Sequence, residues 1–237
     1  MKPNLTREQL VQLSSLYYRC EKYDDMITCA KRLISDNPDL TVMERNVFFE
    51  GYKFKLDKQR KSLIKLIAIE QKELKRGSSH AHLITEIKTP AIADLIETTK
   101  DFDAQIDILL ERSKNFNDMV LYNRYKCDFL RYRCQFLPKH KRESEVKMFM
   151  DICDKAEKII QQYLSVTNIR YMELMLSKCV FLYEILNKRK DAIQLARNVI
   201  EPVKTNDNLD HEMKQILQIF KSNIIIWSKK SEADVII

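Results

Sequence analysis

The chain has 237 residues, of which only 2 are glycine and 5 are proline, well below the usual shares of about 7% and 5%. Sheet-rich and doubly wound folds need many tight turns, so this composition argues against them and favours long helices joined by short polar loops. The net charge of +7 comes from 41 basic and 34 acidic residues that are interspersed along the chain. Such mixing indicates solvated helix faces more than a surface for nucleic acid.

The first part of the chain predicts three helices, because its apolar residues recur with helical spacing. A short helix is expected at about 5–20, and a second at about 23–35, where a proline soon follows. The third helix is long, from 41 to about 76. It begins with Thr41 followed three residues later by Glu44, which is the signature of a capping box.

The next segment, about 80–113, is helical by pattern but carries Pro90 in its interior. A proline inside a helix removes one backbone hydrogen bond and clashes with the preceding turn, so a break or strong kink is expected near Lys88 to Pro90. Five more helices are expected at about 116–136, 141–164, 168–187, 189–203 and 209–229. The fold class is therefore all-α, a nine-helix antiparallel array, and the lack of a fixed repeat argues against a tetratricopeptide array.

The cysteines and histidines indicate neither a disulfide framework nor a metal site. No CxxC pair occurs, and the two histidines of His80-Ala-His82 point apart on a helix with no third ligand nearby. Since no stretch approaches the ~18 apolar residues of a membrane span, we expect a cytoplasmic protein with reduced thiols and no membrane partner. The six cysteines are Cys20, Cys29, Cys127, Cys134, Cys153 and Cys179.

Four polar residues form a candidate anion site. Lys53 and Arg60 are seven residues apart on the long third helix and project from one face of it, while Arg131 and Tyr132 are adjacent on a later helix. If the two helices face each other, three cations and a phenol converge on one dianion. Guanidinium forks, an ammonium and a hydroxyl donor suit a phosphate. Spacing alone leaves ordinary solvated helix faces as the alternative.

A family resemblance favours the phosphate site. Landmarks spread from residue 5 to 228 resemble those of 14-3-3 proteins, in the family's order and near its spacing. This resemblance implies a cup-shaped protomer whose concave groove binds phosphoserine or phosphothreonine peptides in extended form, a role that needs no cofactor and no catalysis. The landmarks are Glu21-Lys-Tyr-Asp-Asp-Met26, Glu44-Arg-Asn-Val47, Tyr52-Lys53, Ile69-Glu-Gln-Lys72, Arg131-Tyr132, Tyr183-Glu-Ile-Leu-Asn187 and Asn223-Ile-Ile-Ile-Trp227.

The resemblance also assigns roles to residues. The family's phosphate pocket corresponds to Lys53, Arg60, Arg131 and Tyr132, and all four residue types are retained. Asp128 is expected to orient the cations, or else to be an ordinary partner of Arg131 three residues later. The expected peptide groove consists of Asn223, Trp227, Lys126, Ser177, Glu184, Leu176, Val180 and Ile219, with Ile216 and Ile226 in its apolar wall, although core packing is the alternative for these apolar residues.

Several residues depart from the family pattern. Ser177 stands where the family has a second backbone-holding asparagine, and its hydroxyl is shorter and offers one donor in place of two. Lys178 replaces an aromatic residue and Tyr171 replaces an arginine. The chain is basic where the family is acidic. We therefore expect altered peptide affinity or orientation with an intact phosphate pocket.

The partner prediction is a set of phosphorylated client proteins together with a second copy of the chain. Family members pair through their first four helices, so a homodimer is expected, with an altered fourth helix changing its geometry. One domain is expected at 1–229, followed by a flexible tail at 230–237 whose Ser231 follows two lysines and invites phosphorylation. Interface positions correspond to Leu16, Cys20, Lys22, Asp25 and Ser62.

Two other functions stay open at this point. The first is a divergent helical scaffold whose groove has lost phosphopeptide binding, with its own tail as a candidate occupant. The second is a basic helical nucleic-acid binder, which the interspersed charges disfavour. Binding of matched phosphorylated and unphosphorylated peptides separates these functions from a phosphopeptide adaptor.

Overall fold

The computed structural model describes residues 5–78, 80–165, 167–203 and 209–233. These residues form α-helices joined by short connections, and no strand occurs within them, which confirms the all-α prediction. The predicted helix boundaries differ from the observed ones by at most four residues. The helices are α1 (Arg7–Arg19), α2 (Tyr23–Asp36), α3 (Val42–Lys75), α4 (Ala81–Arg112), α5 (Phe116–Phe136), α6 (Lys139–Tyr163), α7 (Ile169–Glu184), α8 (Arg189–Ile200) and α9 (His211–Ala233), with a 3-10 helix at Glu201–Val203.

The chain divides into two compact units, Met1–Ser113 and Lys114–Ile237. The N-terminal unit holds α1 to α4 and the C-terminal unit holds α5 to α9. The prediction of one domain at 1–229 stays a prediction. Helix α9 continues to Ala233, and the rest of the expected tail, at 234–237, lies outside the described residues. The side chain of Ser231 is also outside them.

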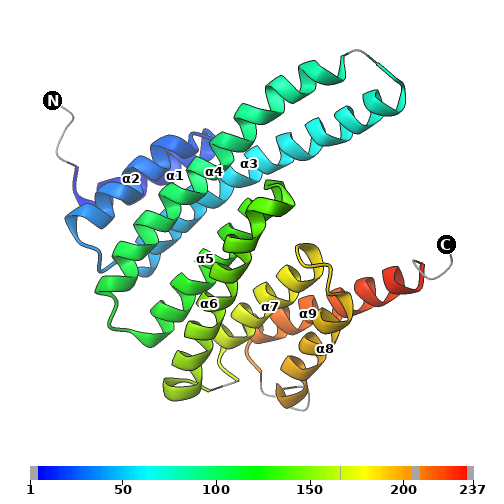
Figure 1. Cartoon of the computed structure of the whole chain (residues 1–237). Helices are drawn as coiled ribbons and strands as arrows, with labels where there is room; N and C mark the ends of the chain where they lie inside the picture. The colour runs from blue at the N-terminus through cyan, green and yellow to red at the C-terminus, as the bar shows by residue number, and fades with distance from the viewer. Residues whose placement is uncertain (1–4, 79, 166, 204–208, 234–237) are drawn as a thin grey trace. The chain divides into compact units, whose positions relative to one another are not determined.

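The N-terminal unit is built on a long antiparallel hairpin of α3 and α4, and the hairpin extends beyond α1 and α2 (Figure 1). An aromatic cluster of Phe48, Tyr52 and Phe102, all 0% exposed, fills its core. The Phe48 and Phe102 rings stack with centroids 5.1 Å apart, and the Tyr52 hydroxyl donates to Asp101 Oδ2 at 2.7 Å. Gly51 faces α2, where a Cβ would lie 3.4 Å from Ile27 Cγ1, an ordinary contact distance.

The start and end of α3 follow the sequence signals. The Thr41 side chain accepts a hydrogen bond from the Glu44 backbone N–H, and the Glu44 carboxylate accepts from the Thr41 N–H at 2.8 Å. This reciprocal pair satisfies two backbone donors at the helix start, as the capping-box prediction requires. At the other end, Gly77 has φ +65°, a left-handed conformation that glycine adopts without a steric cost.

Pro90 does not interrupt α4, so the break, one of the two outcomes expected near Lys88 to Pro90, does not occur: the helix is continuous from Ala81 to Arg112. The strong kink, the other expected outcome, stays a prediction. Pro90 is exposed, so the carbonyl left without its N–H partner can be solvated instead of being buried. The neighbouring turn is also tied to α3, because Lys88 forms an ion pair with Glu70 and the Thr85 hydroxyl donates to the same carboxylate at 2.9 Å.

Pro90→Ala is expected to stabilise the chain by about 1–3 kcal/mol, because alanine restores the missing backbone hydrogen bond in an exposed helix interior. Urea unfolding followed by far-UV circular dichroism measures the change as a higher midpoint. Glu86→Ala, one turn earlier and equally exposed, is the control and should change the free energy of unfolding by less than about 0.5 kcal/mol. An unchanged or lower midpoint for Pro90→Ala would contradict the explanation.

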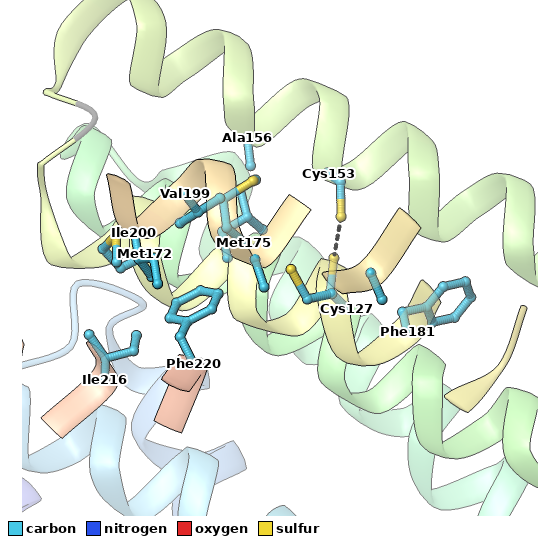
Figure 2. Close-up of a cluster of buried hydrophobic side chains, with 14 of the residues drawn as sticks. Cys127, Cys153, Ala156, Met172, Met175, Phe181, Val199, Ile200, Ile216 and Phe220 are labelled. Atoms are coloured by element: carbon cyan, nitrogen blue, oxygen red, sulfur yellow. Dashed lines mark hydrogen bonds between the residues drawn. The ribbon is translucent and has the colours of Figure 1, made fainter. Parts of the chain in front are cut away.

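The C-terminal unit has an apolar core between α5, α6, α7, α8 and α9, part of which is drawn in Figure 2. Phe149 and Phe181 are both 0% exposed, and their rings stack with centroids 3.6 Å apart. Cys127 and Cys153 lie across α5 and α6 with their sulfur atoms 3.5 Å apart (Figure 2). Burial raises the pKa of the Cys179 thiol to about 12, so this cysteine stays a protonated, unreactive core residue near neutral pH.

Candidate functional site

A cavity of about 560 Å³ opens on the C-terminal unit between α5, α7 and α9. Its volume lies within the range of ligand pockets, which are typically apolar with a few placed polar groups. Here the polar share is larger, since arginines and carboxylates from all three helices line an apolar floor. The lining residues are Arg124, Asp128, Arg131, Ile169, Arg170, Glu173, Leu176, Ser177, Val180, Glu212, Gln215, Ile216 and Ile219.

Arg131 is an enclosed cation of the predicted phosphate pocket, with a side chain 14% exposed. Its Nη1 donates to Glu184 Oε2 at 2.6 Å, and its guanidinium lies 4.6 Å from the Tyr132 ring centroid. Burial alone would lower the pKa of Arg131, but the Glu184 and Asp128 carboxylates outweigh it and raise that pKa. The buried Nε has no hydrogen-bond partner among the described residues. Arg131 is therefore a permanent cation with unused donor capacity.

Asp128 sits at the centre of a second network in the cavity. Its Oδ2 accepts from Arg124 Nη1 at 3.1 Å, and its Oδ1 accepts a short hydrogen bond from the Ser177 hydroxyl. The ion pair that Asp128 makes is thus with Arg124, four residues earlier, and the alternative pairing with Arg131 is not observed within the described residues. Asp128 still acts on Arg131, since its carboxylate helps to raise the pKa of that arginine.

Four charged residues of the cavity were not predicted from the sequence: Arg124, Arg170, Glu173 and Glu212. Arg170 Nη1 and Glu173 Oε2 form an ion pair of 2.8 Å across one turn of α7, and Glu212 adds a carboxylate from the first turn of α9. In the sequence, the first pair is indistinguishable from an ordinary surface pair at i,i+3. Only the packing of α7 beside α5 and α9 places it in a cavity.

The predicted groove residues separate into two groups in the structure. Leu176, Ser177, Val180, Ile216 and Ile219 line the cavity. Asn223 is half-buried one turn beyond Ile219 on the same side of α9, outside the cavity lining.

Trp227, Lys126 and Ile226 complete the second group. Trp227 is 5% exposed and stacks on Tyr183 with centroids 4.6 Å apart, so it packs in the core of this unit. Lys126 is half-buried and projects from another side of α5 than Arg124 and Asp128. Ile226 is 51% exposed on α9 and outside the cavity lining.

Lys53 and Arg60 belong to α3 of the N-terminal unit. Lys53 Nζ lies 5.9 Å from the Phe54 ring centroid and 6.0 Å from that of Phe49, which holds the ammonium on an aromatic surface. The Arg60 side chain is 20% exposed, and its Nη1 is 3.5 Å from Asp57 Oδ1. Both cations project from neighbouring positions two turns apart on one side of α3, as their spacing predicts.

Nothing in the described ranges gathers three or more side chains of the kind that hold a metal ion. Within the same ranges, every helix is too short or too polar to cross a membrane. The fold and the cavity define an all-α protein with a charged, apolar-floored pocket on its C-terminal unit.

Comparison with known proteins identifies the family. The family model described as 14-3-3 protein matches residues 13–228. The 14-3-3-like protein GF14 omicron of Arabidopsis thaliana is 29% identical over 95% of this chain and 92% of its own length. A 14-3-3 protein homolog of Trichoderma harzianum is 30% identical over 96% and 89%, and the checkpoint signal transducer rad24 of Schizosaccharomyces pombe is 28% identical over 96% and 87%. The chain belongs to the 14-3-3 protein family, which confirms the sequence-based resemblance and the prediction of a non-enzymatic protein.

Proposed function

We propose that this protein is an adaptor that binds phosphoserine or phosphothreonine segments of client proteins. The phosphate is held by Lys53, Arg60, Arg131 and Tyr132, the four residues that correspond to the family's phosphate pocket. The observation that supports the proposal best is Arg131: it is enclosed, permanently charged and lines the open cavity of the C-terminal unit, where the half-exposed Glu184 carboxylate occupies its Nη1. A phosphate dianion is a stronger partner for such a guanidinium, and charge-assisted hydrogen bonds of this kind contribute about 1.5–3 kcal/mol each.

The client phosphate has to displace Glu184 from Arg131. Its carboxylate occupies the Arg131 Nη1 donor at 2.6 Å and is 45% exposed. A dianion with three acceptor oxygens competes for that donor more strongly than a carboxylate that water already solvates. Because Glu184 can turn to solvent, the exchange does not bury an unpaired charge. The Glu184 carboxylate thus keeps the arginine side chain in place until a phosphate arrives.

The client chain beyond the phosphate is proposed to run over the cavity of the C-terminal unit. Asn223 offers a side-chain amide for the client backbone, and Leu176, Val180 and Ile219 offer apolar contacts. Ser177 contributes less than an asparagine at its position, because its hydroxyl already donates to Asp128. Backbone clamping then relies mainly on Asn223.

Fluorescence polarisation with matched phosphorylated and unphosphorylated peptides tests the proposal. We expect the phosphorylated peptide alone to bind in the micromolar range or tighter, with affinity falling below about pH 6 as the phosphate takes up a proton. Equal binding of both peptides would reject the adaptor function. It would favour the second candidate, a scaffold without phosphate recognition, which the occupied donors of Ser177 and Arg131 support.

We also propose that the protein pairs as a homodimer through its N-terminal unit. The residues that correspond to the family's interface are exposed within this unit, and the largest of them, Leu16, is 57% exposed. An apolar side chain this exposed is a natural contact for a second copy. Sedimentation at micromolar protein is expected to give about 56 kDa, twice the 28.2 kDa of one chain. The interface positions are Leu16, Cys20, Lys22, Asp25 and Ser62.

Leu16→Glu is expected to convert the dimer to a monomer, because it places a carboxylate in the apolar contact. Ile225→Glu is the control, since Ile225 is equally exposed, at 56%, on α9 of the C-terminal unit. A wild-type monomer near 28 kDa, or a dimer that survives Leu16→Glu and not Ile225→Glu, would contradict this proposal.

A further inference from the structure

One face of α3 carries a row of cations that lies outside the proposed phosphate pocket and borders Ser62 of the proposed dimer interface. Helical positions advance by 100°, so these residues fall within about 60° of one another around the helix axis and form a continuous line. All of them are exposed. We call them the α3 cation stripe: Lys58, Lys61, Lys65, Lys72 and the C-cap residue Arg76.

The stripe keeps most of its charge free of protein partners. Lys58 is 3.5 Å from Glu21 in an exposed pair, and Arg76 is 3.2 Å from Glu73. Lys61, Lys65 and Lys72 have no ion-pair partner among the described residues. The opposite face of α3 holds Leu63, which is 0% exposed, so the helix is fixed by its apolar side and presents the cations outward. Unpaired like charges in a row repel one another, which is a cost unless an anion occupies the row.

Three classes of polyanion fit a row of cations, and the structure favours one. Single-stranded nucleic acid is held by aromatic side chains on which bases stack, yet α3 has no aromatic residue from Lys58 onward. A helix that lies on anionic lipid needs a wide, continuous apolar face. The exposed apolar side chains of this part of α3, Ile64, Ile69 and Leu74, point in different directions around the helix and form no such face. An acidic polypeptide, in contrast, can be bound by a row of cations alone, without aromatic or apolar contacts.

We propose that the α3 cation stripe binds an acidic segment of the client next to its phosphorylated residue. This inference rests on the proposed phosphopeptide function and names the client class: phosphosites that are flanked on one side by several Asp, Glu or further phosphorylated residues. Lys53 and Arg60 lie on the neighbouring side of the same helix, about a third of a turn from the stripe. A client held there by its phosphate has only to pass around α3 to reach the stripe.

The dimensions agree with a short segment. From Lys58 to Arg76 the helix rises about 27 Å at 1.5 Å per residue, which an extended chain covers in roughly eight residues. Acidic residues at every second position of such a segment would lie next to the cations of the stripe. Each exposed ion pair between the stripe and the client is weak. The stripe therefore adds a preference for acidic clients that decreases as the salt concentration rises.

Four synthetic peptides test the inference: a phosphoserine peptide with an eight-residue Glu-rich flank, the same peptide with a Gln/Ser flank, and the unphosphorylated form of each. The flank is placed before the phosphoserine in one set and after it in a second set. For the wild-type protein we expect the acidic flank on one of the two sides to tighten phosphopeptide binding by about tenfold at 50 mM salt, and by less at 200 mM.

The triple variant Lys61→Gln, Lys65→Gln, Lys72→Gln is expected to lose the preference for the acidic flank and to bind the neutral phosphopeptide as the wild type does. The matched control is Lys155→Gln, Lys158→Gln, Lys190→Gln, which removes the same charge from exposed lysines of α6 and α8 and should keep the preference. An acidic flank that makes no difference on either side, or a control that loses the preference equally, would overturn the inference.

The two proposals fail in different measurements. Equal binding of the two neutral-flank peptides rejects the phosphopeptide function, and the stripe inference falls with it. A normal phosphate dependence without a flank preference rejects the stripe alone. A single-stranded oligonucleotide or phosphatidylserine vesicles serve as competitors; if either binds more tightly than the acidic phosphopeptide and needs Lys61, Lys65 and Lys72, the acidic-segment inference is wrong.

Discussion

Arg131→Ala is expected to weaken phosphopeptide binding by roughly 30- to 1,000-fold, equivalent to about 2–4 kcal/mol. The variant removes a guanidinium with a paired Nη1 and a buried, unpartnered Nε. It also leaves the Glu184 carboxylate, formerly the partner of that guanidinium, as a negative charge beside the incoming phosphate. Both changes act in the same direction, which is why this residue should have the largest effect on function.

Arg170→Ala is the matched control. Arg170 is also an arginine that lines the cavity, and it also forms a short ion pair, here with Glu173 at 2.8 Å. It lies outside the proposed phosphate pocket, so its loss should change phosphopeptide affinity by less than about threefold. Arg131→Lys should fall between the two, because lysine keeps the charge and loses the fork. Titrations by fluorescence polarisation at fixed salt measure all three variants.

Two outcomes would contradict the proposed role of Arg131. Wild-type affinity in Arg131→Ala would mean that the phosphate is held elsewhere. Equal losses in Arg131→Ala and Arg170→Ala would mean that the cavity attracts phosphate only through its overall charge. In either case the phosphate-binding residues have to be sought again, while membership in the family is unaffected.

The helices could be predicted from the sequence because their signals are local. The capping box of Thr41 and Glu44 and the bounds of 116–136 need only spacing within a few residues. Pro90 shows the limit of such signals. The cost of a proline inside a helix depends partly on whether the carbonyl that it leaves unpaired can be solvated, and exposure is a property of the packed hairpin that the local sequence does not contain.

The candidate site could be predicted in its residue types and less well in its contacts. Arg131 was expected to be a cation of the phosphate pocket, and the structure shows it enclosed and charged. Its partner Glu184 is 53 residues away, and the Ser177–Asp128 hydrogen bond joins residues 49 apart. Contacts between helices at such separations depend on how α5 packs against α7, for which periodicity on one helix gives no information.

Phe149→Ala is expected to destabilise the chain by about 3–5 kcal/mol. The ring is 0% exposed and stacks on Phe181 at 3.6 Å, so the variant loses buried apolar surface and leaves a cavity between α6 and α7. Trp227 reports on this unit, because it is the chain's single tryptophan and is 5% exposed against Tyr183. Urea unfolding followed by tryptophan fluorescence should show a clearly lower midpoint.

Phe102→Ala carries the same experiment to the N-terminal unit and tests the prediction of a single domain. Phe102 is 0% exposed and packs on Phe48 and Tyr52, so a loss of about 3–5 kcal/mol is expected there as well. If residues 1–229 unfold as one domain, Phe102→Ala must lower the midpoint seen by Trp227 fluorescence as much as the midpoint seen by far-UV circular dichroism, because both probes follow one cooperative transition. We expect coincident shifts. A Trp227 transition that stays at its wild-type midpoint, while circular dichroism shows an earlier step, would instead establish the two compact units as separate folding domains.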